Sequence, residues 1–549
     1  MAYGAKEAVW HRLLEDKEGY SLLRKMSSVI TLGSILALAA SASGLAKAPT
    51  QVSLVQVSGP PPSPLAGCSN VGQPGRNFPD AEVEPQVAVH GSNMVAMWHQ
   101  DRWSNGGAHG IGVGFSNDGG KTWGDTTLPI DMCSPGTPAS LSFYQRASDP
   151  WVSFGPDGTA YASALSFNRT DNKNAVAAAS STDGGATWDN VQPIPGSVFT
   201  TSQFSTDKNA TTADPVKAGT AYTVWDTLVL ATDQPDDNPH TQAYTGPTYF
   251  SKTTDGGQTW SQAKIIVDTA QRQQTIGNIV VVDPRDGALY DFTDLIVSPN
   301  TPFQGTRSNA QLAFVKSTDG GDTWTAPHIV APFNSLGVID PNTAQPLRVG
   351  DGLEEVAIDP SSGKLYVVYE SSTNYAKNLN QSRGVWDNEI LLTSSRDGGT
   401  TWTQPSVVHA LASGLPTYTP TVAVNGGTVA VTYYDNRNLT PGQTANLPTD
   451  YWVKYSADGG VTFGNEQHIT GPFDQLTAPV ARGFFLGDYE GLQPSGSGFQ
   501  AVFVKTNCNA TDTAGQVFAA GGPCAPASST ATATSNTNPT DVFSAYLTP

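Results

Sequence analysis

The chain has 549 residues, and its 38% hydrophobic content is enough to build a large globular core. Its 48 acidic residues outnumber 29 basic ones, and the formal charge of −19 argues against nucleic acid or an anionic membrane surface as partners, because both would be repelled. The 55 glycines and 39 prolines are typical of many short strands joined by turns.

Residues 1–48 are predicted to be an N-terminal extension and a secretory signal peptide. Arg24 and Lys25 precede the apolar stretch 29–40, and small residues follow at 40–44. This order is typical of a secretory signal, and the apolar stretch is short for a transmembrane helix. A buried N-terminal helix is the alternative. We therefore expect a secreted protein, extracellular or periplasmic, without membrane insertion.

Four cysteines fit an oxidising compartment. Cys508 and Cys524 flank a loop rich in Gly, Ala and Thr, which favours a bond between them. Cys68 and Cys133 would then pair by elimination, although four cysteines allow three connectivities in all. None of them has a spacing typical of a zinc site, and we expect no cofactor.

Six segments share the pattern Ser/Thr-x-Asp-Gly-Gly-x-Thr-Trp/Phe. Their aspartates are Asp118, Asp183, Asp255, Asp319, Asp397 and Asp458. The Asp side chain can accept backbone N–H bonds, and the two glycines supply backbone angles that other residues avoid. The Thr and Trp begin a returning strand, where the Trp can pack between neighbouring sheets. The pattern therefore predicts a structural turn rather than a catalytic group.

Two apolar strands precede each turn. The first strands are predicted to begin at 85, 149, 209, 278, 355 and 420, and the second strands at 94, 159, 221, 288, 365 and 429. A third strand leads into each turn and a fourth leaves it. Four short antiparallel strands in each unit predict the blade of a β-propeller.

A further unit follows the sixth turn without a turn motif of its own. Segments 487–492, 498–504 and 541–547 supply three strands, and the N-terminal segment 51–57 can supply the fourth, which would remove exposed sheet edges. Residues 81–549 are thus predicted to form an all-β propeller, with seven blades favoured and six as the alternative. Residues 49–80 are predicted to be the closing strand and a linker.

Carboxylates, arginines and tyrosines stand before the first strands and after the second strands, so they should converge near the propeller axis. The catalytic candidates are Asp101, Asp149, Glu354, Tyr489 and Glu490, and the substrate-binding candidates are Arg102, Arg348, Asp435, Arg437, Arg482 and Asp488. Glycoside hydrolysis needs an acid and a second group as base or nucleophile, and arginines bind carboxylates in bidentate fashion. Ion pairs between blades, turn caps and a calcium site are the alternatives for these side chains.

The six turns resemble the Asp boxes of the sialidase/neuraminidase superfamily, over roughly residues 80–549. The resemblance implies an exo-α-sialidase type of glycosidase, with a tyrosine nucleophile, a carboxylate partner and arginines that bind the substrate's carboxylate. The stretch that matches the family's Arg-Ile-Pro motif reads Val83-Glu84-Pro85-Gln86 here, without the arginine. Arg102 matches a second arginine of the family pattern. The family's acidic residue has no counterpart in 104–109, so Asp101 or Asp149 would replace it.

The sequence therefore predicts a secreted, monomeric, sialidase-like glycoside hydrolase that acts on glycans with an anionic sugar. Asp149 or Asp101 would be the acid, and Tyr489 with Glu354 or Glu490 would be the nucleophile and base. A non-catalytic propeller that binds glycans or proteins is one alternative. A polysaccharide lyase, which would use Tyr or His, is the second.

Overall fold

The computed structural model describes residues 52–68, 73–230, 243–297, 310–334, 337–350, 352–371, 388–411, 415–507 and 538–549. The chain divides into two compact units, Met1–Thr50 and Gln51–Pro549, and every described element belongs to the second. These elements are strands, apart from the short 3-10 helix η1 (Gln475–Thr477). Over the same residues, the structure contains no helix with the length and apolar character needed to cross a membrane.

The strands pair antiparallel into four-stranded sheets that follow the chain. The first sheet contains β2 (Glu82–His90), β3 (Asn93–Arg102), β4 (Ala108–Ser116) and β5 (Gly124–Leu128), and the second contains β6 (Arg146–Phe154), β7 (Ala160–Phe167), β8 (Asn174–Ser181) and β9 (Asp189–Pro193). The third contains β10 (Phe204–Ala213), β11 (Ala221–Leu230), β13 (Thr248–Thr253) and β14 (Lys264–Val267), with β12 (Ala243–Thr245) on β11, and the fourth contains β15 (Gln273–Val282), β16 (Leu289–Val297), β17 (Ala310–Ser317) and β18 (His328–Pro332). The fifth contains β21 (Glu354–Ile358), β22 (Leu365–Ser371), β23 (Glu389–Ser395) and β24 (Ser406–Ala410), and the sixth contains β25 (Thr417–Asn425), β26 (Thr428–Asp435), β27 (Pro448–Ser456) and β28 (Gln467–Asp474). The first two of these sheets are joined by the pairing of Ala108 with Ala147.

The last four-stranded sheet combines the two ends of the described chain. It contains β30 (Gly491–Ser495), β31 (Gly498–Thr506), β32 (Thr540–Leu547) and β1 (Leu54–Gln56). β1 pairs antiparallel with β32, as the sequence predicted for the N-terminal segment. The next residue, Val57, donates its N–H to the carbonyl of Val542 at 2.8 Å, and its side chain is buried. The N-terminal segment is therefore an integral part of this sheet.

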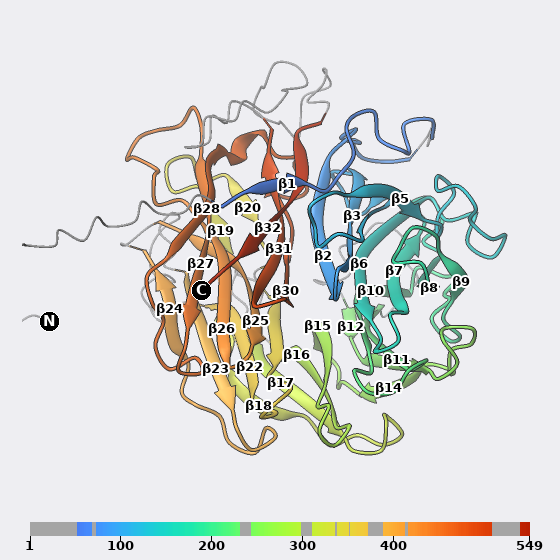
Figure 1. The fold of residues 1–549 in the computed structure, drawn as a ribbon. Helices are drawn as coiled ribbons and strands as arrows, with labels where there is room; N and C mark the ends of the chain where they lie inside the picture. Colours follow the sequence, from blue (N-terminus) through green and yellow to red (C-terminus); the bar gives the residue numbers. More distant parts are fainter. Residues whose placement is uncertain are drawn as a thin grey trace, which may run out of the picture. The chain divides into compact units, whose positions relative to one another are not determined.

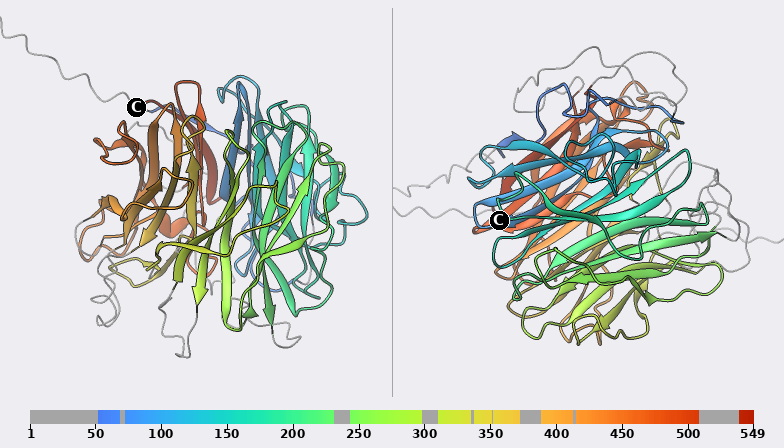
Figure 2. Two further views of the ribbon diagram at one scale, coloured as in Figure 1. Left: turned by 90° about the horizontal axis from the view of Figure 1, so that it is seen from below. Right: turned by 90° about the vertical axis from the view of Figure 1, so that its right-hand side faces the viewer.

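Neighbouring sheets touch through their first strands. β2 contacts β6, β6 contacts β10, and the contacts continue through β15, β21, β25 and β30, which contacts β2. In Figure 1 the first strands lie toward the middle of residues 51–549, whereas the fourth strands β9, β14, β18 and β24 lie on the outside. Figure 2 shows that the loops gather at the two ends of the strands. Residues at equivalent strand ends are thereby brought close to one another.

A small additional sheet lies among the larger ones. It consists of β19 (Val338–Ile339), β20 (Pro346–Arg348) and β29 (Phe484–Phe485). β20 and β29 pair in parallel, with Leu347 opposite Phe484 and Arg348 opposite Phe485. This pairing joins two segments that are far apart in the sequence, and both contribute to the site described below.

The six repeated segments form one kind of turn between the third and fourth strands of their sheets. In the turn at Asp319, one carboxylate oxygen accepts the hydroxyl of Ser317 at 2.8 Å and the backbone N–H of Thr323 at 2.9 Å. The N–H of Gly321 donates to the Ser317 hydroxyl at 2.9 Å. At Asp118, hydrogen bonds from Thr122 lower the carboxyl pKa to about 2. These aspartates are therefore occupied with holding turns.

The second glycine of the turn also fixes the contact with the preceding sheet. Gly321 has a φ of +85°, and a Cβ at this position would lie 2.3 Å from Cζ of Phe250 in β13. The ring of Trp324 packs edge-on against the same Phe250, with 5.2 Å between ring centroids. The predicted packing of the motif Trp between neighbouring sheets is confirmed here.

The Cys68–Cys133 disulfide is present, as the sequence predicted. It joins the segment after β1 to the connection between β5 and β6. The second predicted pair, Cys508 with Cys524, lies outside the described residues, as do the predicted signal peptide and its cleavage region.

Replacing Gly321 with alanine should destabilise the protein more than the same change at Gly256. Both glycines have positive φ, but a Cβ at Gly256 meets open space. The left-handed backbone alone costs about 1–2 kcal/mol, and overpacking against Phe250 adds about 1–3 kcal/mol. Chemical denaturation of Gly321→Ala and Gly256→Ala measures the difference. Equal losses would show that the turn does not set the distance between sheets.

Candidate functional site

The first strands begin earlier than predicted and carry an irregularity at the predicted site residues. β2 begins at Glu82 and β6 at Arg146, so Glu84 and Asp149 lie inside strands rather than before them. The register of β2 with β3 shifts between Val83 and Gln86, and that of β6 with β7 shifts between Ser148 and Trp151. These shifts correct the predicted strand starts.

A proline lies at each of these two irregularities. Pro85 and Pro150 have no N–H to give to the ladder, so the pairing is interrupted at each of them. The preceding residues, Glu84 and Asp149, have φ values of +60° and +53°. An extra residue in one strand re-aims a side chain, and such bulges are frequent beside active sites. The bulges direct both carboxylates toward β3.

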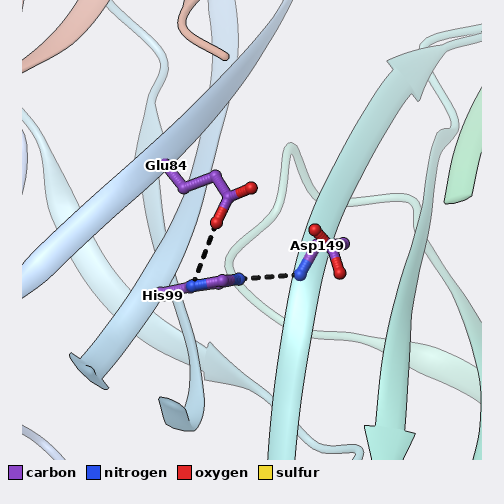
Figure 3. Close-up of side chains that lie close together, drawn as sticks. All are labelled: Glu84, His99 and Asp149. Atoms are coloured by element: carbon purple, nitrogen blue, oxygen red, sulfur yellow. Dashed lines mark hydrogen bonds and ion pairs between the residues drawn. The ribbon is translucent and has the colours of Figure 1, made fainter. Parts of the chain in front are cut away.

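Glu84 and Asp149 meet His99 of β3 from opposite sides (Figure 3). The backbone N–H of Asp149 donates to His99 Nε2 at 2.7 Å, while Glu84 Oε2 lies 3.2 Å from Nδ1. Because a backbone N–H can only donate, Nε2 accepts this hydrogen bond and carries no proton. Burial lowers the pKa of His99 well below its usual range, and the charges of Arg102 and Arg348 lower it further. His99 is therefore neutral.

Glu84, His99 and Asp149 also form a group of the kind that can hold a metal ion, since their ligand atoms all lie within 4.8 Å of one another. The lone pair of Nε2, however, is already used by the Asp149 N–H. At the other ring nitrogen, Arg102 Nη1 lies 2.7 Å from Nδ1. A metal ion would need these lone pairs and would meet a guanidinium. The three residues therefore fit a hydrogen-bonded cluster better than a metal centre.

Two arginines share one aromatic ring beside this cluster. Cζ of Arg102 lies 4.7 Å from the centroid of Phe485, and Cζ of Arg348 lies 4.5 Å from it. Arg348 Nε lies 3.0 and 3.1 Å from the two carboxylate oxygens of Asp488, and its Nη2 pairs with the same group. Gly350 allows this approach, because a Cβ there would overlap the backbone carbonyl of Asp488. β20 and β29 thus bring Arg348, Phe485 and Asp488 together.

The exposure of the side chains differs across the site, with some residues fully buried and others accessible to solvent. Glu84 and His99 are completely buried, whereas the side chains of Arg348 and Asp488 are 29% and 14% exposed. Arg482 is exposed and has a φ of +67°. Its neighbour Gly483 packs so closely that a Cβ would lie 2.7 Å from the backbone nitrogen of Arg348. The accessible part of the site therefore carries arginines and Asp488.

Burial and neighbouring charges give the carboxyl groups of the site different pKa values. Burial raises the pKa of Asp149 to about 6; the charge of Asp207 adds to the rise, and Lys208 opposes it. Burial also raises the pKa of Glu84 well above its usual range, together with Asp488 and Asp149. Although burial acts against it, the pKa of Arg348 is raised by Asp488. Asp149 can thus hold or release a proton near neutral pH.

Asp101 is engaged in anchoring the N-terminal segment. Its carboxylate accepts the N–H of Asp80 at 2.8 Å and the hydroxyl of Ser63 at 3.1 Å, and it lies 3.1 Å from Nδ1 of His109. Its role as the acid stays a prediction. The geometry favours Asp149, which faces His99 and the arginines.

Three of the predicted catalytic residues are buried, namely Tyr489, Glu490 and Glu354. The hydroxyl of Tyr489 donates to the carbonyl of Pro150 at 3.2 Å, and burial raises its pKa well above the usual range, as do the charges of Glu84 and Asp149. Glu490 accepts the hydroxyl of Tyr434 at 2.9 Å. Glu354 is fully buried, and burial followed by the charge of Asp294 raises its pKa.

Asp435 and Arg437 belong to an ion-pair network instead of joining Arg348. Arg437 Nε lies 3.0 and 2.8 Å from the two oxygens of Asp435, and its Nη1 lies 2.6 Å from Glu466. The guanidinium also stacks on Trp452 at 3.7 Å, and His409 lies between Asp435 and Glu466. These contacts correspond to the structural alternative that the sequence left open for this pair.

His99 and Phe485 were not predicted as contributors to the site, whereas Glu84 and Lys208 were expected on the same face of the propeller without an assigned role. β3, whose start was predicted at 94, extends to Arg102 and includes the buried His99. A histidine directly before the run Gln100-Asp101-Arg102 was the available signal. Lys208 lies at a third bulge, between Asp207 and Asn209 of β10.

No family model matches the chain, and no curated protein matches it. Among solved structures, it is similar to an α-L-arabinofuranosidase from Fusarium graminearum, with 14% identity, 69% of this chain and 92% of that chain covered, and a TM-score of 0.41. It is also similar to a Hadza microbial sialidase (16% identity, 75% and 70% covered, TM-score 0.39) and to Trypanosoma rangeli sialidase (15%, 65% and 53%, 0.38). Because the TM-scores are near 0.4, the function is argued from the site alone.

Asp149→Asn should change how stability depends on pH. A carboxyl whose pKa rises to about 6 on folding contributes stability that is present at low pH and is lost as pH rises from about 4 to 6. The free energy of unfolding of Asp149→Asn minus that of the wild type should therefore increase by about 2 kcal/mol between pH 4 and 7. Denaturant titrations at both pH values measure it, with the exposed Asp189→Asn as control. A constant difference would contradict the assigned environment.

Proposed function

We propose that the protein is a glycoside hydrolase of the sialidase-like type, secreted and acting on glycans that carry an anionic sugar. The observation that carries the proposal is the stacking of Arg102 and Arg348 on the one ring of Phe485, beside Asp149 and Asp488. An acid with a raised pKa, a second carboxylate and two guanidinium groups are the ingredients that cleavage of an anionic glycoside requires.

Asp149 is the proposed general acid. Its pKa of about 6 leaves a protonated fraction at mildly acidic pH, and this proton can be given to the oxygen of the leaving group. Breaking the glycosidic bond places negative charge on that oxygen, and protonation neutralises it. His99 supports this role because it holds the backbone of Asp149 through Nε2.

Asp488 is the proposed second carboxylate. It is the more accessible of the two and is oriented by its bidentate contact with Arg348. In that position it can act as a base toward water or stabilise positive charge that develops on the sugar. Arg348 and the exposed Arg482 would hold an anionic group of the substrate, since guanidinium groups bind carboxylates through paired hydrogen bonds.

Hydrolysis of fluorogenic glycosides tests this function. The purified protein should cleave a sialoside or another anionic glycoside, and Asp149→Asn should lower kcat/KM by about 100-fold or more. Arg348→Ala should chiefly raise KM, because it removes a group that binds the substrate. Arg396→Ala, an exposed arginine in one of the repeated turns, serves as the control with unchanged kinetics. Absence of cleavage across a panel of anionic and neutral glycosides would overturn the proposal.

A non-catalytic glycan-binding propeller is the second candidate. The observation that favours it is the ion pair of Arg348 with Asp488, because a carboxylate engaged with an arginine is less available as a base. In that case glycans would bind without turnover, and Arg348→Ala would weaken binding.

We also propose that the sheets are the seven blades of a propeller closed by β1. The order of contacts among the first strands, in which β30 follows β25 and precedes β2, supports this arrangement. The pairing of β1 with β32 supports closure by the N-terminal segment.

Val57→Asp tests the closure. Val57 is 2% exposed, whereas the preceding Gln56, the last residue of β1, is exposed. A charge at the buried position should lower the free energy of unfolding by at least about 3 kcal/mol, while Gln56→Asp should change it by less than about 1 kcal/mol. Equal, small effects in thermal or denaturant unfolding would show that the N-terminal strand is dispensable.

A further inference from the structure

Lys208 is a buried cation that the predicted site does not use. It lies at the bulge of β10, and only 3% of its surface is exposed. Its ammonium has no hydrogen-bond partner within the described part of the chain. A buried ammonium without such partners is costly, so other interactions must stabilise it.

Two aromatic rings surround the ammonium. Nζ lies 4.0 Å from the centroid of Trp151 and 4.0 Å from that of Tyr489. The two rings are themselves 5.4 Å apart. A cation close to an aromatic face is attracted by the ring, and the attraction is stronger when the site excludes water. The lysine is therefore held between the two rings.

The rings belong to the two segments that carry the proposed catalytic carboxylates. Trp151 follows Asp149 in β6, separated only by Pro150, and Tyr489 directly follows Asp488. The hydroxyl of Tyr489 also donates to the carbonyl of Pro150, so the segments are joined twice. Lys208 comes from a third element and lies between them.

The elements that surround the ammonium each carry a carboxyl group. These groups are Asp149 of β6, Glu355 of β21, Glu84 of β2 and Asp488 of the segment before β30, with Asp207 adjacent on β10. Burial lowers the pKa of Lys208, and the first four carboxylates oppose this change. Burial raises the pKa of Glu355 to about 8, and Lys208 lowers it. The ammonium is thus placed to act on the charge of its neighbours.

We propose that Lys208 is a positioning residue of the site, which clamps the Asp149 strand to the Asp488–Tyr489 segment and sets the charge state of Asp149. Its ammonium is enclosed, so it acts through these residues and does not touch the substrate. The reason for its burial is electrostatic, since a neutral side chain of the same length would remove one of the two cations, Lys208 and Arg102, that oppose the charges of Asp207 and Asp488 at Asp149. The catalytic consequence of this placement rests on the proposed function.

The titration of Asp149 tests the proposal without any need for turnover. Protein labelled with ¹³C at the aspartate carboxyls is titrated by NMR, and the Asp149 resonance is identified by its loss in Asp149→Asn. In Lys208→Met the midpoint should rise by about one pH unit, because the charge of Lys208 lowers the pKa of Asp149 and a nearby opposite charge lowers a carboxyl pKa by about 1–3 units. In Lys208→Arg, which keeps the charge, the midpoint should stay near that of the wild type.

Lys173→Met is the matched control, because Lys173 is 41% exposed and pairs with Asp171. It should leave the Asp149 midpoint unchanged. Circular dichroism establishes that each variant is folded, and Lys208→Gln replaces Lys208→Met if the latter does not fold. A folded, uncharged variant with an unchanged Asp149 midpoint would overturn the proposal and leave Lys208 as a packing residue.

The pH profile of hydrolysis extends the test and separates the two proposals. If Asp149 is the acid, the alkaline limb of kcat/KM should move to higher pH in Lys208→Met by the same shift as the NMR midpoint. A shifted midpoint in a protein that cleaves no glycoside would retain the role of Lys208 and reject the proposed function. Hydrolysis of a glycoside by a protein whose Asp149 midpoint does not shift in Lys208→Met would support the proposed function and reject the role of Lys208.

Discussion

The close approach of one sheet to the next, at the second glycine of three of the repeated turns (Gly185, Gly321 and Gly399), is the constraint on which the structure depends. At Gly321 there is no room for even a methyl group beside Phe250, and at Gly399 a Cβ would lie 2.4 Å from Cζ of Phe314. Sheets that meet so closely on their outer side must also meet at their first strands. The buried charges of the site are consequently held by packing that lies at the opposite end of the strands.

The site itself combines burial with opposing charge. Removing carboxylates from water raises their pKa, and nearby guanidinium or ammonium groups counter this rise. At Asp149 the competing effects leave a pKa of about 6, whereas Glu84, which is fully buried, is raised further. A carboxyl group therefore serves as a titrating group at Asp149 and as a neighbour of the neutral His99 at Glu84.

Much of the fold could be predicted because its signals are local. An Asp, two glycines and a Thr within five residues specify the turn, and the spacing of the turns sets the length of each unit. The ion pair of Asp435 with Arg437 is equally local, since the two residues are separated by one position. The strand starts were less predictable, because Pro85 and Pro150 read as strand boundaries although the strands continue through them as bulges. The meeting of Arg348 with Asp488 depends on two short strands distant in sequence, and no local pattern reports such a pairing.

The pairing of β1 with β32 has a consequence for how the protein is made. Leu54 lies opposite Ala545, so the last sheet needs residues from both ends of the chain. During synthesis, the early sheets can pack as they emerge, but β1 must wait without its partner until β32 has been made. Contacts between residues so distant in sequence form slowly. A chain that ended before β32 would therefore leave β1 without its partner and the edge of β31 uncovered.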